Sequence, residues 1–262
     1  MFLVDSHCHL NLVANELPND SIDAIVERAK NAGVQYFLNV CTSLAEFPAL
    51  HETALAIPTV AVSVGVHPNE ENESVDLPTL IKLASLDEVI AIGETGLDYF
   101  RSNGELDWQR ERFLVHIEAA KATHKPLIIH TRQAKEDTLR LMQEGKAGEV
   151  GGVLHCFTED LEMALAAIDL GFYISFSGMV TFKNSTILQT VAKEIPLNRM
   201  LVETDAPYLA PAPMRGKVNE PQFIYHTAAF IANLRSISTD ELAQQTTDNF
   251  FTLFKGAMRP HV

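Results

Sequence analysis

The sequence predicts an α/β fold, a TIM-type (β/α)8 barrel. Three observations predict it. The chain has 262 residues, close to the roughly 250 that such a barrel needs. Eight short apolar runs recur along it, and segments with helical spacing lie between them. Because the runs are nearly continuously apolar, we expect strands buried on both faces, as in a parallel sheet covered by helices.

Each apolar run is expected to be one strand, and eight strands are enough to close a barrel. No linker, low-complexity tract or internal repeat divides the chain, so residues 1–262 are expected to form one domain. The expected strands occupy residues 3–10, 36–40, 59–67, 89–97, 126–132, 151–157, 172–178 and 200–206.

The helices are expected from spacing and from their end signals. The first has apolar residues at positions 22, 25, 26 and 29, with Asp20 or Ser21 to cap its start and Gly33 to end it. Positions 113, 117 and 120, and positions 161, 165 and 168, repeat this spacing. A last helix begins with the capping-box pair at 238 and 241 and ends near residue 254.

The segment from Pro207 to Pro221 is the longest expected connection. It follows the last strand and is rich in proline. A loop of this length in a compact domain is usually functional, and barrels carry their sites on the face where the strands end. We therefore expect this loop to border a site.

Composition narrows the class of protein. A net charge of −14 repels polyanions at long range, which argues against tight wrapping of nucleic acid but leaves a metal-assisted nuclease open. The start of the chain has no signal-peptide pattern and no run is long enough to span a membrane, so we expect no membrane association. The three cysteines do not resemble a disulfide scaffold, and a reducing cytoplasm fits best.

Two histidines at the end of the first expected strand are the first sign of a metal site. His7 and His9 are two residues apart, and because side chains alternate along a strand, both imidazoles point the same way. Alone, such a pair is as well explained by two hydrogen-bonded core histidines. The recurrence of ligand types at the ends of strands four, five, six and eight favours metal binding. The candidate ligands are His7, His9, Glu94, His130, His155 and Asp205.

Six protein ligands exceed what one open catalytic ion needs. They suit two divalent ions about 3.5–4 Å apart, with a carboxylate between them. Mixed imidazole and carboxylate ligands suit zinc, manganese or iron, with magnesium where oxygen and water dominate. We expect two divalent ions (Mg, Mn or Zn), with Glu94 as the catalytic bridge; the plain alternative for Glu94 is a buried structural ion pair.

Two carboxylates of the eighth strand have roles that the sequence leaves open. Asp205 can bind a metal directly or accept the proton of the attacking water as a general base. Glu203 has the same strand parity and is expected to orient a metal ligand without binding the metal itself. A buried ion pair between Glu203 and an arginine is an equal alternative.

Substrate contacts are expected on the same rim. Arg132 shares the face of His130, while Arg215 and Lys217 occupy the long loop where barrels often bind phosphate. Each of these alone is more often a solvated surface charge, but together they suit an anionic substrate. His67 and Tyr99 also lie on this rim, where they either contact substrate or shape a loop.

These motifs resemble the TatD family of metal-dependent deoxyribonucleases, among the amidohydrolase-like barrels. The resemblance spans the chain through DSHCHL, GVHP, IGETGLDY, HTR, GGVLHCF and ETDAPYLAP, which begin at residues 5, 65, 92, 130, 151 and 203. It implies a divalent-metal site built from the six candidate ligands and hydrolysis of ester bonds, chiefly the phosphodiesters of DNA. The same barrel and ligands serve several hydrolyses, so the resemblance leaves the substrate open.

Three functions therefore compete. The first is a deoxyribonuclease or phosphodiesterase that uses metal-activated water on DNA ends or single strands. The second is a small-molecule amidohydrolase or phosphoesterase, favoured by the negative charge. The third is a metal-bound scaffold without activity. The sequence leaves four points open: the native metal, the cleavage polarity, the preference for DNA over RNA and the oligomeric state. A monomer is one of the oligomeric states that it allows.

Overall fold

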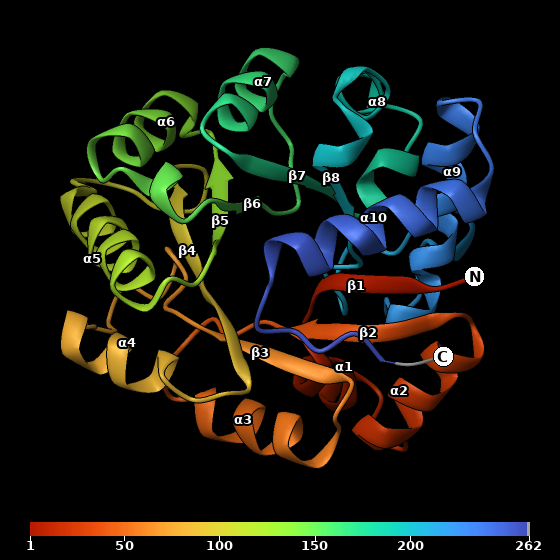
Figure 1. The fold of residues 1–262 in the computed structure, drawn as a ribbon, viewed down its shortest axis with the longest axis horizontal. Coiled ribbons are helices and arrows are strands. Elements are labelled where there is room, and N and C mark those ends of the chain that lie inside the picture. The colour runs from red at the N-terminus through yellow and green to blue at the C-terminus, as the bar shows by residue number, and fades with distance from the viewer. Residues whose placement is uncertain (261–262) are drawn as a thin grey trace.

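Eight parallel strands form one sheet in the order β1 to β8, as the sequence predicts (Figure 1). The computed structural model describes residues 1–260. Every expected strand is present, although several are shorter than expected at their C-terminal ends. The strands are β1 (Leu3–Cys8), β2 (Val34–Asn39), β3 (Val60–Val64), β4 (Val89–Asp98), β5 (Leu127–Arg132), β6 (Gly152–Leu154), β7 (Phe172–Phe176) and β8 (Met200–Val202).

Helices surround the sheet and connect its strands (Figure 1). They are α1 (Leu10–Glu16), α2 (Ile22–Asn31), α3 (Phe47–Ala56), α4 (Leu77–Ala84), α5 (Asp107–Thr123), α6 (Lys135–Glu144), α7 (Leu161–Asp169), α8 (Thr186–Glu194), α9 (Ile224–Leu234) and α10 (Thr239–Leu253).

The helix ends follow the expected chemistry. Of the two candidate caps for α2, Ser21 is the one used: its hydroxyl accepts the Ala24 N–H at 3.2 Å. Gly33 follows that helix with φ +95°, a left-handed conformation in which a side chain is strained. Ser238 caps α10 by accepting the Glu241 N–H at 3.1 Å.

Apolar side chains fill the barrel on two levels. A large cluster lies between the strands and the surrounding helices. A smaller one gathers inward-facing strand residues such as Val4, Tyr36 and Ile90 with Phe250 of α10 and Phe254 just after it. Since these strand residues lie in the first halves of their strands, α10 covers the N-terminal end of the barrel. The opposite, C-terminal end is left for the site.

The first and last strands meet through a few specific bonds. His9 N–H donates to the Ala206 carbonyl and Asp205 N–H to the His7 carbonyl, both at 2.9 Å. The buried carboxylate of Asp5 accepts the Thr204 N–H at 2.9 Å and the Thr204 hydroxyl at 2.6 Å. We call these contacts the β1–β8 seam; of the residues that they join, Asp5 and Thr204 are 199 positions apart.

A β-bulge changes which face the residues of β1 present. Asp5 pairs with Phe37 and Cys8 with Asn39, so three steps along β1 match two along β2. Val4 belongs to the inner cluster and Cys8 to the outer one. The bulge lies at the start of the histidine pair, where it re-aims the side chains that follow.

No helix within residues 1–260 is both long enough and apolar enough to cross a membrane. The long connection after β8 is less irregular than expected. It contains two short 3-10 helices, at Ala212–Met214 and Pro221–Phe223.

Close packing of β4 against β5 leaves no room for a side chain at Gly96. Its φ is +132°, and an added Cβ would collide with the His130 carbonyl oxygen. We expect Gly96→Ala to lower the free energy of unfolding by at least about 3 kcal/mol, because conformational strain and overpacking add. A urea titration measures this.

Gly104→Ala is the matched control. Gly104 also has a positive φ (+85°), but nothing lies within 4 Å of an added Cβ. Gly104→Ala should lower the free energy of unfolding by about 1 kcal/mol, because only the strained backbone conformation opposes the new side chain. Equal losses for the two variants would contradict the packing argument.

Candidate metal centre

The six side chains that the sequence marks as metal ligands converge at the C-terminal end of the barrel. Each comes from the second half of a strand or from the first residues after it. His7 lies in β1 and His9 just beyond it, Glu94 lies in β4, His130 in β5, His155 follows β6, and Asp205 follows β8. All six side chains are at most 17% exposed, and each lies less than 4 Å from another member, so the group is a buried cluster.

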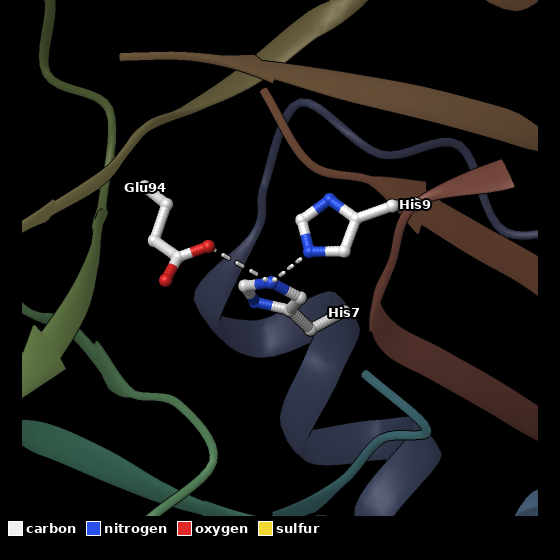
Figure 2. Close-up of side chains that lie close together, drawn as sticks. All are labelled: His7, His9 and Glu94. Carbon is white, nitrogen blue, oxygen red and sulfur yellow. Dashed lines mark hydrogen bonds and ion pairs between the residues drawn. The ribbon is translucent and has the colours of Figure 1, made fainter. Parts of the chain in front are cut away.

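Glu94 is at the centre of this cluster, and Figure 2 shows its carboxylate facing the ring nitrogen of His7 that also faces His9. Its Oε2 lies 3.3 Å from His7 Nε2. Its Oε1 lies 2.8 Å from His155 Nε2, 3.1 Å from His130 Nδ1 and 3.2 Å from His67 Nε2. The two oxygens of one carboxylate thus face two different groups of imidazoles.

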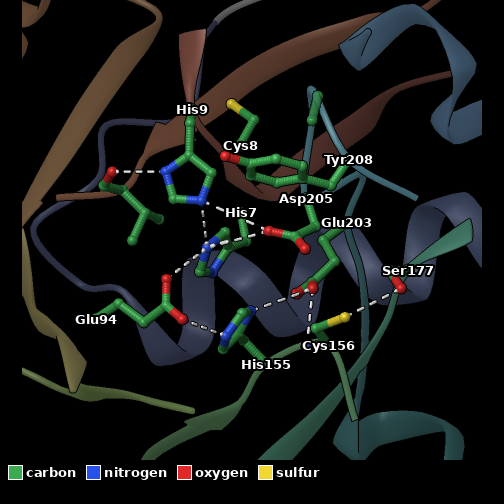
Figure 3. Close-up of polar contacts among 12 residues, drawn as sticks. His7, Cys8, His9, Glu94, His155, Cys156, Ser177, Glu203, Asp205 and Tyr208 are labelled. Carbon is green, nitrogen blue, oxygen red and sulfur yellow. Dashed lines mark hydrogen bonds and ion pairs between the residues drawn. The ribbon is translucent and has the colours of Figure 1, made fainter. Parts of the chain in front are cut away.

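The histidine pair of β1 forms one of these groups, together with Asp205 (Figure 3). His7 Nε2 and His9 Nε2 are 3.3 Å apart, and Asp205 Oδ1 lies 3.7 Å and 3.5 Å from them. His9 Nδ1 donates to the Val40 carbonyl at 3.0 Å, because a carbonyl can only accept. In neutral His9 the lone pair therefore sits on Nε2 and points into the cluster.

Acidic side chains behind two of the imidazoles hold them in place. Asp98 Oδ2 lies 3.2 Å from His130 Nε2. Glu203 Oε1 accepts the Cys156 N–H at 2.8 Å and lies 3.4 Å from His155 Nδ1 (Figure 3). Carboxylates placed behind imidazoles in this way orient metal-binding histidines. No arginine within residues 1–260 pairs with Glu203, so the alternative of an arginine ion pair fails.

The electrostatics keep the carboxylates charged. Burial alone would raise the pKa of Glu94, but the charges of His155 and His67 and hydrogen bonds from His130 and His155 outweigh it, so this pKa lies well below the usual value. Burial likewise opposes ionisation of Asp205, and the hydrogen bond from His9 and the charge of His7 reverse its effect and lower the pKa. Both carboxylates are therefore anionic at neutral pH.

The residues present fit divalent cations. Three sets of side chains have ligand atoms within 4.8 Å of one another: His7, His9 and Glu94; His7, His155 and Glu203; and His67, Glu94 and His130. Within the part of the chain described, the buried atoms His7 Nδ1, His155 Nδ1 and Glu203 Oε2 have no hydrogen-bond partner. Buried polar atoms are rarely left so, and a mixed nitrogen and oxygen donor set suits zinc, manganese or iron.

His67 lies at the centre itself and not only on its rim. The sequence places it as a substrate contact or a loop residue, yet its Nε2 is within reach of Glu94 and it belongs to one of the three ligand sets. Its expected strand ends earlier, at Val64, so His67 reaches the cluster from the loop that follows. Strand parity carries no information about such a position.

The structure does not bring Tyr99 to the centre. Its hydroxyl donates to Asp137 Oδ2 on α6 at 2.6 Å, and the guanidinium of Arg110 lies 5.6 Å from its ring centroid. Tyr99 therefore ties β4 to the outer helices. Of the two roles expected for Tyr99, these contacts agree with shaping a loop, and contact with substrate stays a prediction.

Within residues 1–260, the three cationic candidates form no hydrogen bond or ion pair with the ligand cluster. The guanidinium of Arg132 stacks on Phe100, 4.0 Å from the ring centroid, and that of Arg215 stacks on Phe182 at 4.1 Å. Lys217 is exposed in the long loop after β8. None of them forms an ion pair within residues 1–260, so all three charges remain available to an anion.

Tyr208 is a neighbour of the centre that the sequence did not single out. Its ring is 54% exposed and its centroid lies 6.4 Å from that of His9 (Figure 3). It comes three residues after Asp205, within the ETDAPY segment. This short distance along the sequence from the candidate ligand Asp205 could have marked Tyr208 as a neighbour of the site.

One face of α5 holds the loop that carries His67. His116 is fully buried; its Nε2 accepts the Val66 N–H at 3.0 Å and its Nδ1 donates to the Arg112 carbonyl at 2.8 Å. The Arg112 guanidinium donates to the His67 carbonyl at 3.1 Å. Sequence reasoning placed His116 on a helix and missed this role, because the contacts cross 50 residues.

Gln109 extends the same face of α5 to the end of β4. Its Oε1 accepts the Asp98 N–H at 3.0 Å, and its Nε2 donates to the Pro68 carbonyl at 3.1 Å and to the Ser102 hydroxyl at 2.7 Å. Residues 109, 112 and 116 are three and four positions apart, so they share a helix face. We call these three residues the α5 clasp.

Comparison with known proteins agrees with this geometry. The family model described as TatD related DNase matches residues 4–255. The chain belongs to the TatD-related DNase family. A relative from Escherichia coli K12, named as the uncharacterized metal-dependent hydrolase YcfH, is 46% identical over 254 residues, covering 97% of this chain and 96% of the relative. The chain is thus a metal-dependent hydrolase.

Two further members show the range of this family. The TatD protein of Escherichia fergusonii, named as a 3'-5' ssDNA/RNA exonuclease, is 33% identical over 252 residues, covering 94% of this chain and 96% of its own. The solved structure of YJJV, a TatD homologue from Escherichia coli K12, matches with a TM-score of 0.89 at 26% identity, covering 97% of this chain and 98% of that one. The barrel predicted from the sequence is confirmed.

Binding of cations should stabilise the fold. After treatment with a chelator, addition of Zn²⁺, Mn²⁺ or Mg²⁺ at about 100 times its Kd should add about 2.7 kcal/mol and raise Tm by roughly 5–10 °C. Glu94→Gln should lose most of this shift, because it removes the charge that both imidazole groups face. Glu88→Gln is the control, since Glu88 pairs with His51 at the other end of the barrel. Absence of a shift with all three cations would contradict the metal centre.

The α5 clasp should make stability sensitive to acid. Burial lowers the pKa of His116 from 6.5 to about 4, so the unfolded chain takes up a proton here between these values while the folded chain does not. The folded state therefore loses stability as pH falls through this window, by up to about 3 kcal/mol at pH 4. We expect His116→Gln to have a shallower dependence of the unfolding free energy on pH between 6.5 and 4. Parallel curves for the two proteins would refute this origin.

Proposed function

We propose that this hydrolase cleaves phosphodiester bonds of DNA, acting on single strands or exposed ends. The observation that supports this most is Glu94, whose two oxygens face separate imidazole groups as a carboxylate shared by two cations must. Two-cation centres suit phosphodiester displacement, in which both the attacking and the leaving oxygen need stabilisation. The name of the relative from Escherichia fergusonii supports the same substrate class.

Each cation would be held by its own group of residues. His7, His9 and Asp205 would hold one, while His130 and His155 would hold the other, and Glu94 would join the two. His67 is near enough to assist the second group. When bound, the cations supply positive charge that lowers the pKa of water and stabilises the developing oxyanions. Zinc or manganese suits this imidazole-rich set better than magnesium.

Asp205 is proposed as the residue that accepts a proton. Its side chain is 14% exposed, whereas that of Glu94 is 4% exposed, so Asp205 is the carboxylate closer to entering water. Its lowered pKa keeps it ionised at neutral pH and ready to take a proton. Asp205 Oδ1 faces His7 and His9, so Asp205 Oδ2 is the oxygen that would accept the proton.

Free thiols agree with a reducing compartment. Cys8, Cys41 and Cys156 are unpaired within residues 1–260, and Cys8 and Cys41 are buried. Disulfides are rare in the cytoplasm, where thiols are kept reduced. We infer a cytoplasmic location, in which DNA ends and single strands are accessible.

A small phosphoester or amide is the second candidate substrate. The net charge of −14 favours it, because the field of the whole protein repels a long polyanion more than a small molecule. A panel of nucleotides, esters and amides distinguishes the candidates. Turnover of a small substrate without cleavage of DNA would favour the second candidate, and no metal-dependent turnover at all would leave only the scaffold function.

Cleavage of end-labelled single-stranded DNA with Mn²⁺ or Mg²⁺ tests the main proposal. His130→Ala and Asp205→Asn should each lower kcat/KM by at least about 100-fold, because they remove a metal ligand and the proton acceptor. His51→Ala is the matched control: this histidine pairs with Glu88 at the other end of the barrel and should retain activity. Equal cleavage by the wild type and both site variants would overturn the proposal.

A further inference from the structure

A cavity of about 460 Å³ opens on the same face as the metal centre. It lies between the segment after β7 and the long loop after β8, which both leave the C-terminal ends of neighbouring parallel strands. Its size is within the range of sites for small ligands. It is lined by Thr181, Phe182, Lys183, Asn184, Ser185, Ala212 and Arg215.

The stacked pair of Phe182 and Arg215 is the main chemical feature of this cavity. The guanidinium lies 4.1 Å from the ring centroid. Aromatic rings and guanidinium planes are the two surfaces on which nucleobases stack in single-stranded nucleic acids, and arginine also binds phosphate through two parallel hydrogen bonds. The pair therefore offers contacts to both parts of a nucleotide.

The charge around the cavity suits an anion. Its lining contains Lys183 and Arg215 and no acidic residue. Both side chains are exposed, and neither has an ion-pair partner in the described part of the chain. In a protein with a net charge of −14, an uncompensated positive site of this kind is a local exception.

The two segments around the cavity are fixed to each other. The Thr181 hydroxyl donates to the Gly178 carbonyl at 2.6 Å and accepts the Ala212 N–H at 2.8 Å. The Gln189 amide donates to the Phe182 carbonyl at 3.0 Å. A Cβ on Gly178 would collide with the Leu209 carbonyl oxygen, so the backbones pack directly. The site is preformed, which lowers the entropic cost of binding.

Aromatic and basic side chains also lie on the other side of the barrel mouth, there together with the acidic Glu71. A second cavity of about 330 Å³ is formed by the segments after β3 and β4, and includes Arg101 and Trp108. Nearby, Arg132 stacks on the exposed ring of Phe100. In an eight-stranded ring, strands 3 and 4 lie opposite strands 7 and 8. A polymer that crosses the metal centre would thus meet stacking side chains on both sides.

We propose that the cavity at Phe182 and Arg215 is a subsite for a nucleotide of single-stranded DNA, separate from the bond that is cleaved. The base stacks on the Phe182 and Arg215 pair, and a neighbouring phosphate is bound by Arg215 and Lys183. This inference rests on the proposed nuclease function and adds to it a preference for polymeric substrates over mononucleotides or small diesters.

Binding and hydrolysis are measured separately with the metal-loaded protein. Binding uses the fluorescence anisotropy of a labelled single-stranded oligonucleotide whose phosphorothioate linkages resist cleavage. Hydrolysis uses bis(p-nitrophenyl) phosphate, a small diester that carries no neighbouring nucleotide to occupy the cavity. Arg215→Gln and Phe182→Leu should each raise the Kd of the oligonucleotide about 5-fold or more, as loss of one stacked base does. Phe182→Leu should leave kcat/KM for the small diester within about twofold.

Two variants serve as controls. Phe182→Trp keeps an aromatic face and should retain wild-type affinity. Lys193→Gln removes a positive charge from the last turn of α8, at the other end of the barrel, and should also retain it. Wild-type affinity in both Arg215→Gln and Phe182→Leu, or an equal loss in Phe182→Leu and Phe182→Trp, would overturn the subsite.

The outcomes separate the two proposals. If the oligonucleotide binds in a way that depends on Phe182 and Arg215 but the wild type cleaves neither DNA nor the small diester, the nuclease function fails and the subsite stands as a nucleic-acid contact. If the wild type and both cavity variants cleave DNA with equal efficiency, the nuclease function stands and the subsite fails.

Discussion

The buried negative charge of Glu94 is the interaction on which the site depends. Four imidazoles, from β1, the loop after β3, β5 and the end of β6, lie within 3.3 Å of its oxygens. A carboxylate taken out of water is costly unless it is paired, and ring nitrogens gathered without an anion or a cation among them repel one another. The carboxylate and the imidazoles therefore stabilise one another. Divalent cations bound here would offset both the buried negative charge and the repulsion between the ring nitrogens.

Much of this site could be predicted because it follows strand geometry. The parity of β1 and the placement of ligand types at strand ends were enough to mark His7, His9, Glu94, His130, His155 and Asp205, since parallel strands in a barrel all end on one face. The predicted eight-stranded order was sufficient to bring them together. Glu203 could also be marked in this way, because it shares the parity of Asp205.

The other parts of the site depend on contacts that have no local sequence pattern. His67 reaches Glu94 from a loop, and the Tyr99 hydroxyl, just after β4, hydrogen-bonds to Asp137 on α6. Arg132 and Arg215 lie on aromatic rings that a sequence does not pair with them. The α5 clasp uses side chains that also suit an ordinary exposed helix face. In each case the deciding partner is distant along the chain, so periodicity and spacing could not identify it.

The β1–β8 seam affects when the metal centre can form during synthesis of the chain. His7 and His9 are synthesised before Asp205, and the bonds between Asp5 and Thr204 form only when both ends of the sheet exist. A nascent chain that has made six or seven strands holds histidines without their last carboxylate. The metal centre can therefore be complete only after β8 has been synthesised, so a chain that stops before β8 lacks the full set of ligands for hydrolysis.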